Sequence, residues 1–241
     1  MTKALLVAFC AAMSLPVWAQ SLDRPMVKSG DTWTYRTTTE KGPTGWSQIQ
    51  QAITVTHASD STIYFTVQQS GSPQAPRELL MGSDWSRTRD VNGKQTVVNR
   101  PFSFPLSQGK SWKLDYTEQN PNPVHQAESW DNKYTVVGWE DVEVPAGKFH
   151  ALKIEEDGTW TATMAPNRTV IQGAQVRQDG ASLVTNVRNV TATEHSGRTY
   201  KAFWYVPAVK RWVKSVEEYY SSGGVRSERD TTELASFHVA P

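Results

Sequence analysis

The side chains that could do chemistry in this sequence include five histidines. They are His57, His125, His150, His195 and His238. No two of them form an H-x-H or H-E-x-x-H pattern, so their spacing predicts no zinc site. His150 shares one face of a predicted strand with Leu152 and Ile154, which favours a half-buried structural histidine over a metal ligand.

Carboxylates are the second group with chemical potential, and they gather in three short runs. The runs are Glu140, Asp141 and Glu143, then Glu155, Glu156 and Asp157, and then Glu217 with Glu218. Two carboxylates that face each other across about 5–10 Å would suit glycoside hydrolysis. These acids instead alternate with apolar positions or end predicted strands, where solvated acids usually lie. No G-x-S-x-G elbow, phosphate-binding glycine loop or EF-hand spacing occurs. We therefore expect no catalytic residue, metal or cofactor, and an enzyme is the less favoured interpretation.

Tryptophan is the unusual feature of the composition, with nine residues after position 19. They are Trp33, Trp46, Trp85, Trp112, Trp130, Trp139, Trp160, Trp204 and Trp212. Each such side chain buries a large area, so the simplest interpretation is that they fill the core of a curved sheet. The functional alternative is a surface that stacks on rings or contacts lipid.

Residues 1–19 have the layout of a secretory signal peptide. Lys3 supplies the positive start, Ala4–Val17 is an almost unbroken apolar run, and small Ala19 precedes the expected cut. The run is too short for a membrane-spanning helix, which needs about 20 apolar residues. Cys10 follows a bulky phenylalanine inside this run, which disfavours a lipid-anchored cysteine. We expect Cys10 to leave with the peptide.

The charge of the remaining chain is balanced. Removal of Lys3 leaves 24 of the 25 basic residues against 24 acidic residues. A formal net charge of zero argues against nucleic acid as the partner and against electrostatic capture by anionic lipid. No cysteine remains for a disulfide or a thiolate nucleophile, and no apolar run remains that could span a membrane. We expect one domain over residues 20–241, because a chain of this size can bury a large core.

Alternation of apolar and polar residues dominates residues 20–241 and predicts β-strands. The clearest runs are TWTYRTTT (32–39), TIYFTVQQ (62–69), KYTVVGWEDVEV (133–144) and TYKAFWYV (199–206). Asn92-Gly93, Asp179-Gly180 and Gly223-Gly224 supply the glycines that tight turns need. No window of twelve residues after the signal peptide shows a convincing helical period. The pattern predicts an all-β fold with long hairpins.

Two stretches illustrate the hairpins. EDVEVPAGKFHALKIEE (140–156) places Pro145 and Gly147 between two strands, where a proline followed two residues later by glycine fits a turn with a glycine bulge. Both faces of the returning strand carry bulk, so both are partly covered or a bulge shifts the phase. FWYVPAVKRWVKSVEEYY (203–220) predicts strand, proline-centred turn and strand, with Trp212 across from the Trp204 region.

Several motifs in order resemble a widespread class of exported bacterial proteins of unknown function. They are SGDTWTYR (29–36), FPLSQGKSW (104–112), VPAGKFHALKI (144–154), WYVP (204–207) and RWVK (211–214). The resemblance implies a single antiparallel sheet, strongly curled into an incomplete half β-barrel similar to periplasmic lipoprotein carriers. It implies no catalytic residue. With the signal peptide, it predicts a periplasmic location in the cell envelope, with release from the cell as the alternative.

An incompletely closed sheet lined with aromatic side chains would form a concave apolar groove. We therefore predict a non-enzymatic binder of an apolar or amphipathic ligand. The candidate ligand-binding residues are Trp112, Trp139, Trp160, Trp204 and Trp212. One alternative is a structural or protein-interaction module of the cell envelope, because an open sheet leaves edges that accept a strand. The second alternative is carbohydrate binding through exposed aromatic side chains.

Overall fold

The structure is a computed structural model that describes residues 21–43, 45–164, 168–177, 180–189 and 193–240. The predicted signal peptide with Cys10, and the predicted turn at Asp179, fall wholly or partly outside these residues. No helix in the described ranges is long and apolar enough to cross a membrane. The single-domain prediction for residues 20–241 stays a prediction.

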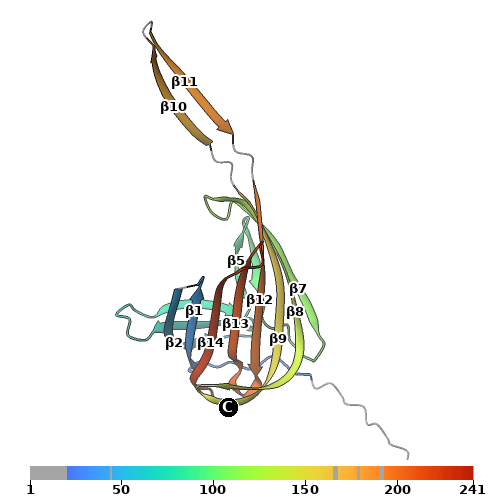
Figure 1. Cartoon of the computed structure of the whole chain (residues 1–241). Coiled ribbons are helices and arrows are strands. Elements are labelled where there is room, and N and C mark those ends of the chain that lie inside the picture. Colours follow the sequence, from blue (N-terminus) through green and yellow to red (C-terminus); the bar gives the residue numbers. More distant parts are fainter. Residues whose placement is uncertain (1–20, 44, 165–167, 178–179, 190–192, 241) are drawn as a thin grey trace, which may run out of the picture.

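Ten antiparallel strands form one large sheet (Figure 1). From one edge to the other they are β4 (Arg77–Gly82), β3 (Thr62–Gln69), β2 (Gly45–Ala58), β1 (Thr32–Lys41), β14 (Arg226–His238), β13 (Arg211–Ser221), β12 (Glu194–Val206), β9 (Gly147–Met164), β8 (His125–Val144) and β7 (Ser111–Gln119). Two further hairpins form separate two-stranded sheets: β5 (Arg87–Val91) with β6 (Lys94–Asn99), and β10 (Arg168–Arg177) with β11 (Gly180–Asn189).

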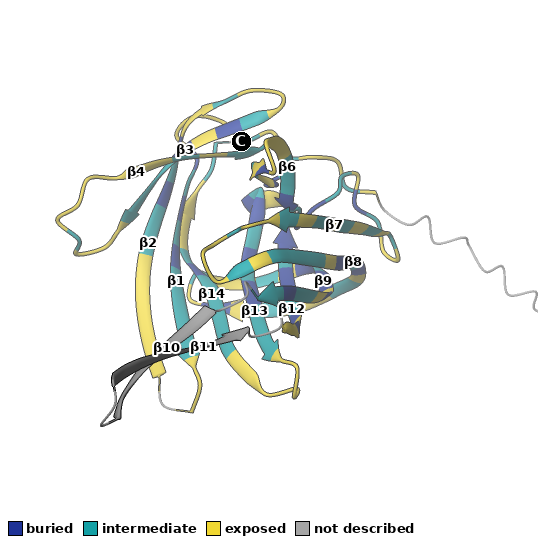
Figure 2. Cartoon of the chain, turned by 90° about the horizontal axis from the view of Figure 1, so that it is seen from above, coloured by how far each residue is buried: buried dark blue, intermediate teal, exposed yellow. Residues whose placement is uncertain are grey.

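The all-β, antiparallel prediction is confirmed, and so are the long hairpins. One sheet was expected, whereas the structure adds the two small hairpins beside it. The ten-stranded sheet is open, with β4 and β7 at its edges, so the strongly curled half-barrel stays a prediction. Figure 2 shows buried segments of β1, β12 and β13 gathered toward the interior, whereas the first half of β2 is exposed.

The predicted Pro-Ala-Gly hairpin is confirmed as the tip of β8 and β9, where Val144 pairs with Gly147. Gly147 has φ +130°, a backbone conformation that favours glycine. The Ala146 N–H donates to the Leu234 carbonyl of β14 at 3.0 Å, although two other strands separate β9 from β14 in the sheet. The phase shift of this hairpin lies on β8, between Val136 and Gly138. The turn therefore has a structural task, which is to anchor the tip on a distant strand.

His150 corrects one expectation. Its side chain is 65% exposed and accepts or donates a hydrogen bond at 2.7 Å with Asp141, itself exposed. Leu152 and Ile154 on the same strand are buried, so burial falls off toward the hairpin tip. Alternation assigns a face of the strand, but it does not say where along the strand the core ends.

The core lies over one face of the sheet and is rich in aromatic rings. Trp33 of β1 and Trp85 of the loop after β4 meet edge to face with ring centroids 5.4 Å apart. Their indole N–H groups donate to the carbonyls of Val209 and Lys210, at 2.8 and 3.0 Å. These two bonds clamp the short 3-10 turn η1 (Pro207–Val209) between β12 and β13.

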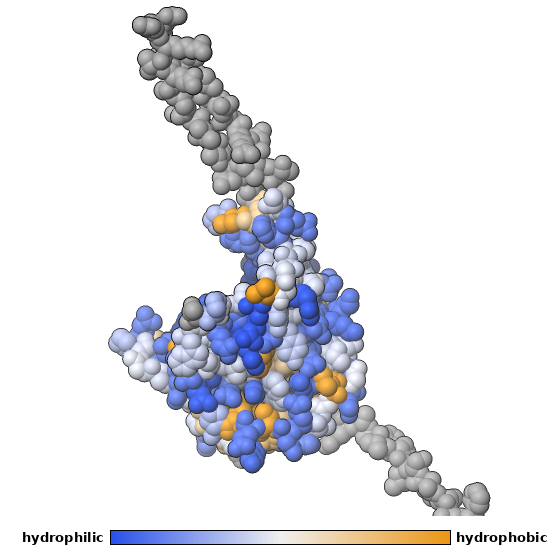
Figure 3. Space-filling model, viewed as in Figure 1, coloured by the Kyte–Doolittle hydropathy of each residue, from blue (hydrophilic) through white to orange (hydrophobic). Residues whose placement is uncertain are grey.

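The predicted strand-turn-strand at 203–220 is confirmed by β12, η1 and β13. Trp212 pairs with Tyr205, which lies within the expected Trp204 region, and a bulge lies between Trp204 and Tyr205. Phe203 and Tyr205 are buried, whereas Trp204 points to the other face and is partly exposed. Figure 3 shows the hydrophobic residues on the viewed surface as several separate patches, one of them at the lower end of the molecule.

Arg211 lies inside the aromatic core, with a residue exposure of 4%. Four rings surround its guanidinium, and the closest centroids are those of Trp212 at 4.1 Å and Trp85 at 4.3 Å. Trp33 and Tyr35 complete the cage at 5.7 and 5.2 Å. Burial lowers the pKa of Arg211, and no ion pair of the described residues includes it. Aromatic faces take the place of a counter-ion here.

Candidate functional site

The core-facing side of the long strands changes character along its length. On β9, Leu152 and Ile154 give way to Glu156, Gly158 and Trp160 at alternate positions, which share one face. Their register partners on β8 are the matching positions Tyr134, Asn132 and Trp130. We call this side of the sheet the inner face. It is apolar near η1, polar in the middle and aromatic again at the far end.

A hollow of about 430 Å³ opens at that far end, and we call it the aromatic cleft. Its aromatic walls are Trp130 of β8, Trp160 of β9, and Tyr219 and Tyr220 of β13. Tyr116, Trp130 and Trp160 follow one another across β7, β8 and β9 as direct register partners. The ring centroids lie 6.4 and 6.3 Å apart along this row. Such a row presents ring faces and edges to a ligand in the hollow.

Gly197 of β12 makes room for the last ring of the row. A Cβ on Gly197 would lie 2.6 Å from the indole Nε1 of Trp160, closer than real Cβ contacts come. Gly197 is the direct register partner of Trp160, so the indole lies across the backbone of the neighbouring strand. The glycine thus positions the Trp160 ring.

Polar groups complete the aromatic cleft. His125 Nδ1 and Glu128 Oε1 are in hydrogen-bond contact, which orients the imidazole. His195 also lines the hollow, together with the four serines Ser196, Ser221, Ser222 and Ser227. The Tyr219 hydroxyl donates to Glu217 at 3.3 Å, and burial raises the pKa of Tyr219, so this hydroxyl stays protonated. Rings beside hydroxyls and imidazoles suit a ligand that is part apolar and part polar.

A buried polar cluster lies below the aromatic cleft on the inner face. Glu156 is 0% exposed and Asn132 is 3% exposed. The Thr199 hydroxyl donates to Glu156 Oε1 at 3.2 Å. Glu156 Oε2 and Asn132 Oδ1 have no hydrogen-bond partner among the described residues. Oxygens of Glu156, Asn132 and Thr199 all converge on the place where Gly158 lacks a side chain. Burial raises the pKa of Glu156, and this effect outweighs the nearby Lys201.

The five predicted tryptophans do not meet in one groove. Trp160 lines the aromatic cleft. Trp112 stacks on Tyr134 with ring planes 2° apart and donates its indole N–H to the Arg100 carbonyl at 3.0 Å. Its place is therefore beside the core, near the β7 edge.

The other three lie elsewhere. Trp139 stacks on His150 at the hairpin end of β8. Trp204 donates to Glu140 and lies between Lys153 and Lys214, at 5.3 and 5.6 Å from its ring centroid. Trp212 packs in the core against Arg211, and its buried indole N–H has no partner among the described residues.

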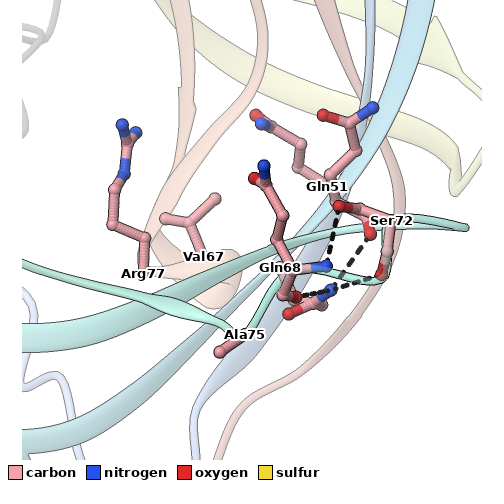
Figure 4. A pocket seen from close by; sticks show the side chains of 8 residues that line it. Gln51, Val67, Gln68, Ser72, Ala75 and Arg77 are labelled. Carbon is pink, nitrogen blue, oxygen red and sulfur yellow. Dashed lines mark hydrogen bonds between the residues drawn. The ribbon is translucent and has the colours of Figure 1, made fainter.

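No group of three or more His, Cys, Asp or Glu that could hold a metal occurs in the described part of the chain. A smaller hollow of about 180 Å³ lies beside Gln51 and Gln68 (Figure 4). The Gln68 amide donates there to the carbonyls of Ser72 and Gln74, at 3.3 and 3.1 Å. We attribute this hollow to the loop after β3, which these two hydrogen bonds hold in place.

No protein-family model matches the chain, and no curated protein matches it. Solved structures with some likeness exist. One is a candidate lipoprotein from Parabacteroides distasonis, with a TM-score of 0.45 and 9% identity, over 91% of this chain and 100% of the other. Another is a candidate exported protein with a YmcC-like fold from Bacteroides fragilis, with a TM-score of 0.44 and 12% identity, over 91% and 100%.

The hypothetical lipoprotein YmcC from Escherichia coli is similar at a TM-score of 0.35 and 10% identity, over 87% of this chain and 85% of the other. These descriptions are of the same kind as the exported bacterial class predicted from the motifs. All three TM-scores are below 0.5, so these likenesses do not establish a family for this chain. Membership of that class, export and the motifs themselves stay predictions.

Sequence reasoning missed Glu156, Asn132 and Tyr219 as members of a site. A signal for the first two was present. In SWDNKY, Asn132 alternates with Trp130 and Tyr134, and in KIEEDGTW, Glu156 alternates with Ile154 and Trp160. A polar residue on an otherwise apolar face is the informative exception in such a pattern.

Proposed function

We propose that this protein is an exported, non-enzymatic binding protein that holds a small amphipathic molecule in the aromatic cleft. The observation that carries the proposal is the hollow of about 430 Å³ walled by Trp130, Trp160, Tyr219 and Tyr220. Hollows of this size suit small organic ligands. We propose the periplasm as its location, on the strength of the signal-peptide pattern.

The chemistry of the lining supports a ligand with a ring or short chain and several polar groups. The Glu128 carboxyl group, the acidic group that lines the cleft, is already hydrogen-bonded to the His125 imidazole, so the described lining residues do not call for a strongly ionic ligand. Ser196, Ser221 and Ser222 offer hydroxyls that both donate and accept hydrogen bonds. A hydroxylated ring is therefore preferred to a plain hydrocarbon chain. The apolar end of the inner face is filled by buried core side chains that include Phe102, Leu106 and Val209.

Native mass spectrometry of the protein, purified gently from the cells that make it, tests this function. We expect discrete extra mass that organic solvent removes. The variant Trp160→Ala should lose most of it, because it loses one wall of the cleft. Trp46→Ala is the matched control, since Trp46 is 67% exposed on β2 and does not line the cleft.

A bare protein is the contrary outcome, and a fluorescent probe then decides. N-phenylnaphthylamine should gain fluorescence with the wild type and with Trp46→Ala, and much less with Trp160→Ala. Equal signals from all three proteins would rule out the aromatic cleft as the binding site.

Partner binding through a sheet edge is a second candidate, favoured by one feature of β2. Its first residues, Gly45–Ile49, pair with β1 only, because β3 pairs with Gln51–Ala58. Trp46 and Ile49 are exposed along this stretch. A free edge of this kind accepts a strand from another chain. Loss of a co-purified protein in Trp46→Ala, with the mass in the cleft unchanged, would support this candidate.

A further inference from the structure

We propose that Glu156 is an uncharged carboxylic acid in the folded protein, that its proton is shared with Asn132, and that loss of this proton redirects its side chain to Lys201 beneath the aromatic cleft. The inference concerns the polar middle of the inner face. It can be tested without any ligand, so it stands or falls separately from the proposed binding function.

The first support is a pair of acceptors without donors. Glu156 Oε2 and Asn132 Oδ1 are both buried and both lack a hydrogen-bond partner among the described residues. Asn132 Oδ1 and Glu156 Oε1 both lie beside the place where Gly158 lacks a side chain. Acceptor oxygens brought together in this way repel each other, whereas a proton on the carboxyl group lets it donate a hydrogen bond to Asn132. One proton therefore satisfies two buried groups, each of which would otherwise be costly to leave unpaired.

The second support is the convergence over Gly158. Oxygens of Thr199, Asn132 and Glu156 surround the point where a side chain on Gly158 would begin. The Glu156 oxygen at this point is Oε1, which accepts a hydrogen bond from Thr199, and the second carboxyl oxygen, Oε2, has no partner among the described residues. The missing side chain at Gly158 is what allows the three groups to approach one another.

The charged and titratable groups around Glu156 come from five strands. Tyr134 of β8 faces it directly, and Tyr116 of β7 lies further along. Lys201 of β12 is its register partner on the other side, and Glu217 of β13 lies beyond Lys201. Asp157 is next to it on β9.

The balance of these charges favours the neutral acid. No ion pair of the described residues includes Glu156 or Lys201. Glu217 and Asp157 both oppose a negative charge at Glu156, and burial opposes it more strongly. Burial thus raises the pKa of Glu156.

Lys201 is the cation with which the ionised form of Glu156 can pair. It is partly exposed and stands between Glu156 and Glu217 in one row across the sheet. A side chain with four rotatable bonds can reach either acid. The two states are then the acid bonded to Asn132 and the carboxylate paired with Lys201.

The aromatic cleft lies close enough to Glu156 to respond to its ionisation. Trp130 and Trp160 are two residues beyond Asn132 and two beyond Gly158 on the same face of their strands. The acid–amide bond joins β8 to β9 just below these rings. When this bond is lost, the base of the aromatic cleft is held less firmly. We therefore expect the fraction of protein that carries a ligand in the cleft to fall as the pH rises.

The experiment is a pH titration of the full chain labelled with carbon-13 at the glutamate carboxyl, read by NMR. The Glu156 signal is identified as the one absent from Glu156→Gln. In the wild type we expect it to titrate well above the other glutamates. Asn132→Ala should lower its pKa because the neutral acid loses its acceptor. Lys201→Met should raise it because the carboxylate loses its cation.

A Glu156 signal that titrates with the bulk of the glutamates would overturn the proposal. So would a raised pKa that does not fall in Asn132→Ala, because burial alone would then explain it. If Asn132→Ala fails to fold, infrared spectroscopy of the wild type gives the answer. A protonated carboxyl band that disappears in Glu156→Gln supports the acid, and its absence refutes it.

Discussion

Two buried ionisable groups of opposite sign lie at different levels of the inner face, and neither belongs to an ion pair of the described residues. Arg211 sits in a cage of four aromatic rings, where the ring faces attract its positive charge. Glu156 lies instead beside Asn132 Oδ1, an acceptor oxygen that repels a negative charge, and accepts one hydrogen bond from the Thr199 hydroxyl. The apolar end of the inner face therefore keeps a charge, whereas the polar middle discourages one.

The polarity of a buried group's surroundings and their tolerance of a charge on that group are therefore different properties. A guanidinium stays charged under nearly all conditions and can lie against π faces. A carboxyl group can take up a proton and so avoid the cost of burial.

The largest effect is expected for Trp85→Ala. Trp85 is buried, donates to the Lys210 carbonyl and covers the Arg211 guanidinium at 4.3 Å. Removal of a buried tryptophan costs about 3–5 kcal/mol, and here it also uncovers a buried charge. Chemical denaturation measures the loss, and Trp46→Ala on the exposed part of β2 should cost under about 0.5 kcal/mol. Equal costs for the two variants would contradict the cage.

Gly158→Ala tests the polar side by steric means. The added methyl group would overlap oxygens of Glu156, Asn132 and Thr199, so we expect a loss of about 1–3 kcal/mol in unfolding free energy. Gly223→Ala is the control, because the nearest atom to its Cβ is 3.9 Å away. A tolerated Gly158→Ala with an unchanged unfolding midpoint would show that the cluster is looser than described.

The pH dependence of stability separates the two buried groups. Burial raises the folded-state pKa of Glu156, so its favourable contribution is complete below the unfolded value of about 4.3. That contribution is lost as the pH rises through the folded pKa. Glu156→Gln should remove this part of the slope and be more stable than the wild type in mildly alkaline buffer. Parallel curves for the two proteins would show that Glu156 is ionised in the fold.

Arg211→Met is expected to change stability by about 1 kcal/mol or less. The variant loses attraction to the rings but no longer buries a charge, and these terms offset each other. Calorimetry at several pH values should give a difference that does not depend on pH. A loss of several kcal/mol would mean that the guanidinium makes a specific contribution that apolar volume cannot replace.

The smallest effect is expected at the exposed pair of Asp141 and His150. Their side chains are 89% and 65% exposed, so solvent screens the interaction. Asp141→Asn should change the unfolding free energy by under about 0.5 kcal/mol. A larger loss would show that the stacking of His150 on Trp139 depends on this bond.

The local sequence was sufficient for the strands and for several turns. Alternation predicted strands at 133–144 and 199–206, and Pro145 with Gly147 predicted the tip of the β8–β9 hairpin. The local sequence did not show how far along a strand burial extends. For this reason the expectation of a half-buried His150 was wrong. Nor could the local sequence assemble the aromatic cleft. Trp160 meets Tyr219 only because β9, β12 and β13 pair in one register, and no local pattern encodes that register.

The order of the sheet has a consequence for how the chain folds. β1 lies beside β14, so the first and last of the fourteen strands meet in the middle of the sheet. Strands β1–β4 join the rest of the sheet only through this contact, which spans about two hundred residues along the chain. During synthesis, the edge of β1 therefore stays unpaired until β14 leaves the ribosome. The pairing of β1 with β14 joins residues that are far apart in the sequence, and we expect formation of this pairing to be the slow step of folding.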